Sequence, residues 1–140
     1  MTTKVEDLTD AELDVLVGET MTIGWSRDDR RWYVPDNLQA GYGGVGMPPG
    51  YAHYDIKPFR PSTDIACAFQ VDKPEWRWDI EELILYDNNA DGHPTLEITL
   101  YGYLHQLADI FIPLDLANKA AAYCRGRCIA ACYACGITEV

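Results

Sequence analysis

The chain has 140 residues, 48% of them hydrophobic, which is enough for one domain with a buried core and excludes disorder of the whole. Acidic residues number 22 against 11 Lys and Arg, and the net charge of -11 argues against direct binding to nucleic acid or to an anionic membrane. The chain begins without an apolar leader and nowhere approaches the roughly 18 apolar residues of a membrane helix, so we expect a cytosolic protein whose five cysteines stay reduced.

The first predicted helix begins at Thr9. Thr9 and Glu12 form a capping box, in which the Thr9 hydroxyl accepts from the Glu12 amide and the Glu12 carboxylate reaches back. Leu8 and Leu13 have the spacing of a hydrophobic staple across this helix start. Gly18 weakens the other end of the helix, because glycine is a poor helix former.

A hairpin and a long loop are predicted next. Residues 21–25 and 31–34 have the composition of strands, and the charged turn at 26–30 joins them. Residues 35–61 contain most of the Gly and Pro without a sustained periodicity, which predicts a loop with a short edge strand near 51–56.

A second helix is predicted after this loop. Ser62 is the expected N-cap, and Asp64 lies in the first turn, where the helix dipole favours a negative charge. Pro74 ends the segment. Three apolar side chains are expected to face the core: Ile65, Ala66 and Phe69.

Two strands and a final helix complete the predicted elements. Residues 78–86 and 95–103 are expected to pair across a polar loop at 87–92. Residues 104–112 fit either a helix or a strand, and a proline separates them from a helix predicted at about 115–135. In the second strand, one alternating set is expected to be buried, namely Leu96, Ile98 and Leu100, against Glu97, Thr99 and Tyr101.

Three segments resemble one known family. Residues 62–66 read Ser-Thr-Asp-Ile-Ala, with an aromatic residue shortly after. Residues 12–19, followed by Gly24-Trp25, and the small residues before Cys124-Arg125 extend the match. The chain resembles the phage ABA sandwich domain, found in small proteins of bacteriophages and prophages. The resemblance implies one α+β domain over residues 1–140, with a mainly antiparallel sheet sandwiched between helices, and it implies no known chemistry.

Four cysteines near the C-terminus form a stripe at helical spacing. They fall within roughly 80° of one another around a helix, but its rise spreads them over roughly 16 Å, whereas one zinc ion needs every ligand at about 2.3 Å. We therefore expect no metal here and predict a buried face of small residues packed on the sheet. The stripe consists of Cys124, Cys128, Cys132 and Cys135, with Ala117, Ala121 and Ala131.

The loop at residues 87–92 matches the opening of a calcium-binding loop. Oxygen-bearing side chains occupy its first, third and fifth positions, and Gly92 occupies the sixth. Ile98 stands where a bidentate glutamate is required, so we expect a polar hairpin loop without metal.

A candidate ligand site comes from arginines and aromatic residues. Residues 41–46 match the dinucleotide-binding glycine pattern by letter, but the prolines after them prevent the helix that this motif requires. Arginines beside aromatic rings suit a phosphate and a stacked base, or a hot spot for a protein partner, and ordinary surface aromatics are the alternative interpretation. The candidate ligand-binding residues are Arg30, Arg31, Trp32, Tyr42, Tyr51 and Tyr54.

Catalysis has little support in the sequence. Ser62 is accounted for as a cap, and the three histidines have no metal-binding spacing. We expect a non-catalytic accessory protein without a cofactor, in the cytosol of a bacterial host, that antagonises a host defence by sequestering a small nucleotide signal. The alternative is an acidic protein that blocks a basic, nucleic-acid-binding host protein. Either hypothesis is compatible with a homo-oligomer.

Overall fold

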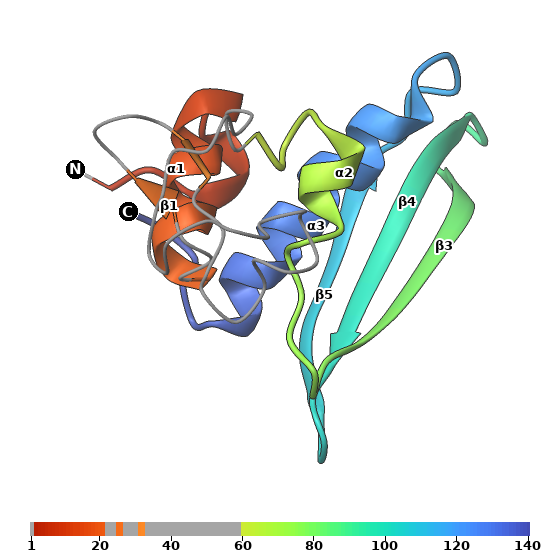
Figure 1. Cartoon of the computed structure of the whole chain (residues 1–140). Coiled ribbons are helices and arrows are strands. Elements are labelled where there is room, and N and C mark those ends of the chain that lie inside the picture. Colours follow the sequence, from red (N-terminus) through yellow and green to blue (C-terminus); the bar gives the residue numbers. More distant parts are fainter. Residues whose placement is uncertain (1, 22–24, 27–30, 33–59) are drawn as a thin grey trace.

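A computed structural model describes residues 2–21, 25–26, 31–32 and 60–140 of the chain. Its largest element is an antiparallel sheet of β3 (Arg77–Tyr86), β4 (Gly92–Tyr101) and β5 (Gln106–Pro113), in the order β3-β4-β5 (Figure 1). The expected strand pair and its loop are confirmed, with Ile80 opposite Ile98. The ambiguous segment is a strand, in which the buried Ala108 and Ile110 alternate with the exposed Asp109 and Phe111.

The helix α3 (Lys119–Ala134) lies at the centre of the fold (Figure 1). One face packs on the sheet, where the Cα of Gly126 lies close to the side chains of Ile98 and Ile112. The opposite face packs against α1 (Asp10–Met21) and α2 (Ile65–Ala68). A helix in such a middle layer is apolar nearly all round, so its sequence gives a weak amphipathic pattern.

The cysteine stripe does not face the sheet, which corrects the sequence prediction. Cys124 and Cys128 each lie two residues from the sheet-facing Gly126, and two residues correspond to a rotation of about 200° around a helix. They therefore point toward α1 and α2. The helix also begins later than predicted, because the Asn118 side chain caps it by accepting from the amide of Ala121 at 3.4 Å.

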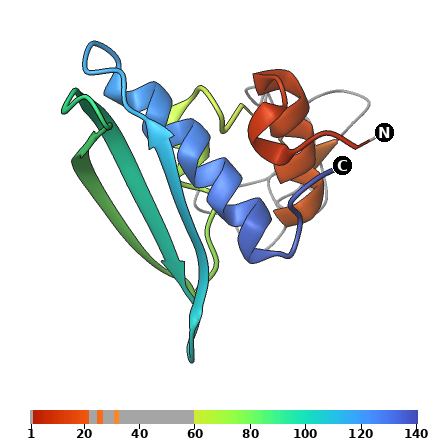
Figure 2. The same ribbon diagram turned by 180° about the vertical axis from the view of Figure 1, so that it is seen from behind.

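The expected α+β class, with an antiparallel sheet packed against helices, is confirmed. The layers run from the sheet through α3 to α1 and α2, so the described helices all lie over one face of the sheet (Figure 2). No described helix covers its other face, where the side chains of Asp79, Glu81 and Asp109 are exposed.

The predicted start of the first helix is confirmed. The amide of Thr9 donates to Oε1 of Glu12 at 3.0 Å, and the amide of Glu12 donates to Oγ1 of Thr9 at 3.2 Å. Leu8 and Leu13 of the staple are both buried. The helix continues past Gly18 to Met21, a residue that the sequence had suggested for a strand.

Replacing Thr9 with alanine is expected to lower the free energy of unfolding by about 1 kcal/mol, because the Glu12 amide loses its acceptor. Urea denaturation followed by circular dichroism measures the change. Thr63→Ala is the matched control, since Thr63 is exposed and lies outside the helices. Equal midpoints for the two variants would show that the box does not stabilise the helix.

The predicted cap of the second helix is wrong. Asp64 is the N-cap of α2, and its Oδ1 accepts from the amides of Ala66 at 2.9 Å and Cys67 at 3.4 Å. Ser62 is instead buried, and its amide donates to Oδ1 of the buried Asp14 at 2.8 Å. This bond ties the segment before α2 to α1.

The predicted core face of α2 is also wrong, because the helix is only four residues long. Ile65 is 41% exposed, Phe69 is 62% exposed, and Ala66 is exposed as well. Cys67 and Ala68 are buried in their place. The chain leaves the helix at Phe69, so Pro74 does not end it.

The predicted hairpin is present in part. β1 (Trp25–Ser26) and β2 (Arg31–Trp32) pair antiparallel, with Trp25 opposite Trp32. Residues 33–59 lie outside the described part of the chain, so the loop predicted at 35–61, apart from its last two residues, stays a prediction.

Candidate binding surface at the open sheet face and the β5 edge

Most of the ligand site predicted from the sequence lies outside the described residues. Arg30, Tyr42, Tyr51 and Tyr54 are among these undescribed positions. The other two predicted residues form strand β2, and their backbone pairs with β1. The described structure neither brings the six residues together nor separates them, so this site stays a prediction.

Carboxylates gather on the sheet face that carries no described helix. In the register, Asp79 lies opposite Thr99, which lies opposite Asp109 on the next strand. In the adjacent row, Glu81 lies opposite Glu97. Because side chains alternate between the two faces of a strand, the four acidic side chains share one face. We call Asp79, Glu81, Glu97 and Asp109 the acidic face.

The acidic face is electrostatically strained. Glu81 and Glu97 are directly opposed, and like charges in this relation destabilise a sheet. Desolvation raises the pKa of Glu97, and a hydrogen bond with Asp109 and repulsion from Asp109, Glu81 and Asp79 raise it further. Thr99 Oγ1 partly compensates by donating to Oδ1 of Asp109 at 3.1 Å. Such a cost to stability is common where a surface serves a function.

Replacing Glu97 with glutamine is expected to raise the midpoint of thermal unfolding at pH 7 and to leave it nearly unchanged near pH 4. A carboxyl with a raised folded-state pKa stabilises fully below its unfolded pKa of about 4.3, and this contribution is lost as pH rises through the folded pKa. Glutamine removes that loss. Melting curves between pH 4 and 7 measure the difference in midpoint between the variant and the wild type. The control is Glu75→Gln, since Glu75 lies before β3. A parallel shift at every pH would contradict the electrostatic explanation.

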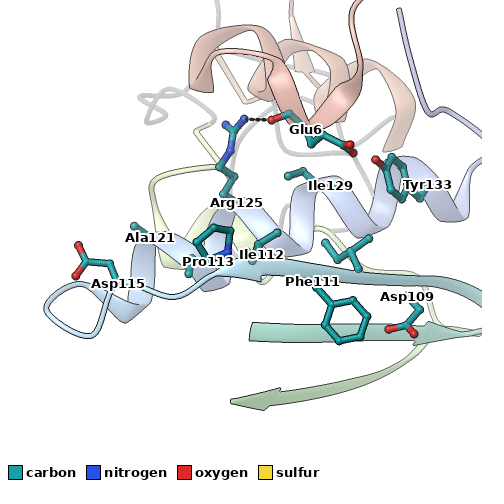
Figure 3. A pocket seen from close by; sticks show the side chains of 12 residues that line it. Glu6, Asp109, Phe111, Ile112, Pro113, Asp115, Ala121, Arg125, Ile129 and Tyr133 are labelled. Carbon is teal, nitrogen blue, oxygen red and sulfur yellow. Dashed lines mark hydrogen bonds between the residues drawn. The ribbon is translucent and has the colours of Figure 1, made fainter. Parts of the chain in front are cut away.

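A groove of about 680 Å³ runs beside the acidic face along strand β5 (Figure 3). Five consecutive β5 residues, 109–113, line one wall. Helix α3 forms the other wall, and Glu6 of the short helix η1 (Val5–Asp7) stands at the rim. The lining residues of α3 are Ala121, Ala122, Arg125, Ile129 and Tyr133.

Arg125, which lines this groove, forms hydrogen bonds with the segment before α1 and with its first residue. Its Nη1 donates to Oδ1 of Asp10 at 2.8 Å, and its Nη2 donates to the carbonyl oxygens of Glu6 at 3.0 Å and Leu8 at 2.6 Å (Figure 3 shows the bond to Glu6). The guanidinium therefore forms its hydrogen bonds with residues at and just before the start of α1. Three other side chains at the groove carry carboxylates: Glu6, Asp109 and Asp115.

The loop at 87–92, which resembles the opening of a calcium-binding loop, forms hydrogen bonds among its own residues and with His93. Oδ1 of Asp87 accepts from the amides of Asn89 at 2.8 Å and Asp91 at 3.0 Å, and Oδ2 lies 3.0 Å from Nε2 of His93. The polar hairpin loop is confirmed. Within this loop, the residue with a left-handed backbone is Ala90, at φ 64°, and not one of the asparagines or aspartates expected there.

The predicted burial of the stripe is confirmed for Cys124, Cys128, Cys132 and Ala131, and it is wrong for Ala117 and Ala121, which are exposed. Cys135 caps the end of α3 and is partly exposed. Desolvation raises the pKa of Cys124, raises that of Cys128 more strongly, and raises that of Cys132 to about 12. No three His, Cys, Asp or Glu side chains in the described ranges are placed to hold a metal ion.

Within the cysteine stripe, thiol labelling of the folded protein is expected to modify Cys135 first and the buried Cys124, Cys128 and Cys132 only after unfolding. A thiolate is the reactive form, and burial keeps these three groups protonated. Mass spectrometry of a time course with iodoacetamide measures the order, and Cys135→Ser provides the control. Rapid modification of all four would contradict the burial.

No family model, curated protein or solved structure matches this chain. The resemblance to the phage ABA sandwich domain stays a prediction. Among the described helices, none has both the length and the apolar character needed to cross a membrane. The fold and surface define an α+β protein whose described helices leave one acidic sheet face open, beside a groove.

Sequence reasoning missed the acidic face and the groove. The signal for the face was present, since Asp79 and Glu81 alternate with apolar residues, as Glu97 does on the next strand. Marking the polar side of each predicted strand would have collected these residues. The groove had no such signal, because it depends on how β5 sits beside α3.

Proposed function

We propose that this protein is a non-catalytic binding protein whose acidic face attracts a basic protein partner. The observation that supports it most is the direct opposition of Glu81 and Glu97 on an open sheet face. A positive partner surface would relieve the repulsion between these like charges, so the acidic face favours binding of a basic protein. The net charge of -11 adds to the attraction of the whole molecule for a positively charged partner.

This surface favours a protein over a nucleic acid. The phosphate backbone of DNA or RNA would meet carboxylates and be repelled, whereas lysines and arginines on a protein would form charge-assisted hydrogen bonds. A nucleic-acid-binding protein presents such a basic patch, and a partner bound there would prevent it from binding DNA. With the phage resemblance, the partner would be a host protein in the bacterial cytosol. The five cysteines, none in a disulfide, are compatible with that compartment.

The test uses a lysine-rich peptide as the probe. Its affinity is expected to fall as salt rises and to fall further in Glu81→Lys and Glu97→Lys, because each replaces attraction with repulsion. Asp91→Lys is the matched control, since it makes the same change of net charge in the loop between β3 and β4. Equal loss in all three variants would mean that only total charge matters. No binding at low salt would contradict the proposed function.

Nucleotide binding remains a second proposal. It is supported by the antiparallel pairing of β1 with β2, the hairpin on which Arg31 and Trp32 were predicted. A ligand that binds the native state raises the melting temperature with its concentration. A panel of cyclic and NAD-derived nucleotides should therefore include one that does so, and Arg31→Ala should abolish the shift. A panel without any effect would contradict it.

A further inference from the structure

The outer edge of β5 has backbone groups directed away from the sheet. The amide of Leu114 donates to the carbonyl of Pro94 at 3.0 Å, and in an antiparallel ladder the residues that bond to one neighbour alternate along the strand. Ile110 and Ile112 therefore bond to β4, whereas Asp109 and Phe111 direct their N–H and C=O groups outward. No strand in the described part of the chain pairs with this edge.

Pro113 limits the length of this edge. It occupies one of the outward positions, where its missing N–H removes a donor that β4 does not use. Proline at such a position is a usual protection against uncontrolled strand pairing. The outward donors at Asp109 and Phe111 precede it, and no described strand pairs with them. The exposed edge is therefore short, which suits a bound peptide more than an extended sheet.

Residues from both faces of β5 line the groove, which runs along this edge. Consecutive β5 residues alternate between the two faces, and all of residues 109–113 line the groove (Figure 3). On the inner side it is bounded by small and apolar side chains of α3, including Ala122 and Ile129. On the outer side it opens to Asp109 of the acidic face and to Phe111, which is 51% exposed.

We propose that the β5 edge binds an extended segment of a partner protein as an added strand. This inference rests on the proposed function and specifies its partner. The segment would alternate, with apolar side chains directed toward Ala122 and Ile129 and basic side chains directed toward Asp109 and Glu97. Its backbone would pair with Asp109 and Phe111, which is the general mode of strand addition.

Charge decides between this occupant and a second copy of the chain. The carboxylates of Glu6, Asp109 and Asp115 surround the groove, while Arg125 is bonded to Asp10 and to backbone carbonyls. Two copies, each with a net charge of -11, would repel each other at this site. A basic segment would instead be attracted.

The test measures binding of a fluorescent peptide of four Lys-Val repeats to the full chain. The control is the same peptide N-methylated on alternate residues, so that its side chains stay while the donors of one edge are lost. We expect the methylated peptide to bind at least about tenfold more weakly, since two or more backbone hydrogen bonds are lost. Hydrogen exchange should show slower exchange of the Asp109 and Phe111 amides when the unmodified peptide is bound.

Substitution of the protein provides an independent measurement. Phe111→Pro removes an outward N–H and should weaken binding, whereas Phe111→Ala keeps the N–H and removes only the ring. Melting curves show whether each variant is folded. If Phe111→Pro does not fold, the comparison of the methylated and unmodified peptides tests strand addition without it. The expected order of affinity is wild type, then Phe111→Ala, then Phe111→Pro.

The outcomes separate this inference from the proposed function. If methylation and Phe111→Pro have no effect while Glu97→Lys weakens binding, the segment lies across the acidic face and strand addition is wrong. If no lysine-rich peptide binds, the proposed function is wrong as well. If sedimentation shows a dimer that Phe111→Pro dissociates, the occupant is a second copy and the inference is overturned.

Discussion

Replacing Arg127 with methionine is expected to lower the free energy of unfolding by about 2–4 kcal/mol, because two buried carbonyls lose their donors. Arg127 is only 5% exposed. Its Nε donates to the carbonyl of Ala68 at 3.1 Å, and its Nη2 donates to that of Val71 at 3.0 Å. The guanidinium also lies 4.1 Å from the ring centre of Trp78 and 5.2 Å from that of Phe69. Arg127 thus joins α2 and β3 to the central helix.

Methionine keeps much of the volume of the arginine side chain, so the expected loss isolates the hydrogen bonds and the ring contacts from simple cavity formation. Arg77→Met is the matched control, since Arg77 is exposed and stacks on Tyr101 at 4.8 Å. A surface contact of this kind contributes about 0.5–1 kcal/mol. Urea denaturation at pH 7 measures both variants. Equal losses would show that water can replace Arg127 at the two carbonyls.

Replacing Gly126 with valine is expected to destabilise the protein by about 3 kcal/mol, the upper end of the usual cost of overpacking a core. A Cβ at this position would overlap Cδ1 of Ile98 and would lie 2.8 Å from Cδ1 of Ile112. Both isoleucines lie on the sheet beneath α3, so the helix would have to move away from it. The better helix propensity of valine over glycine offsets less than about 1 kcal/mol of this.

Ala120→Val is the control for the Gly126 prediction, because Ala120 is exposed in the first turn of the same helix. It introduces a β-branched side chain without a contact to the sheet. Thermal unfolding should show a large fall for Gly126→Val and a small one for Ala120→Val. A small fall for both would mean that the two isoleucines can change rotamer and make room.

Local patterns in the amino-acid sequence were sufficient to predict several elements of the fold. The capping box at Thr9 and Glu12 involves residues three apart, so no distant contact is needed to form it. The alternation around Ile98 predicted a strand and the burial of Leu96 and Leu100, and the polar loop at 87–92 predicted its hairpin partner. Thr99, expected on the other side, lies on the opposite face but is buried as well. These patterns are complete within about ten residues, as strand and turn signals usually are.

The orientation of the ambiguous faces depends on contacts between distant segments, which the sequence pattern does not show. Helix α3 is apolar on two sides, so its sequence could not show that Gly126 faces the sheet and Cys128 faces α1 and α2. Ser62 and Asp64 are both good caps, and the choice depended on Asp14, which is 48 residues away from Ser62 and accepts from its amide. The groove beside β5 arises in the same way, from the distance between a strand edge and a helix. Such features depend on contacts between distant segments, which local patterns do not encode.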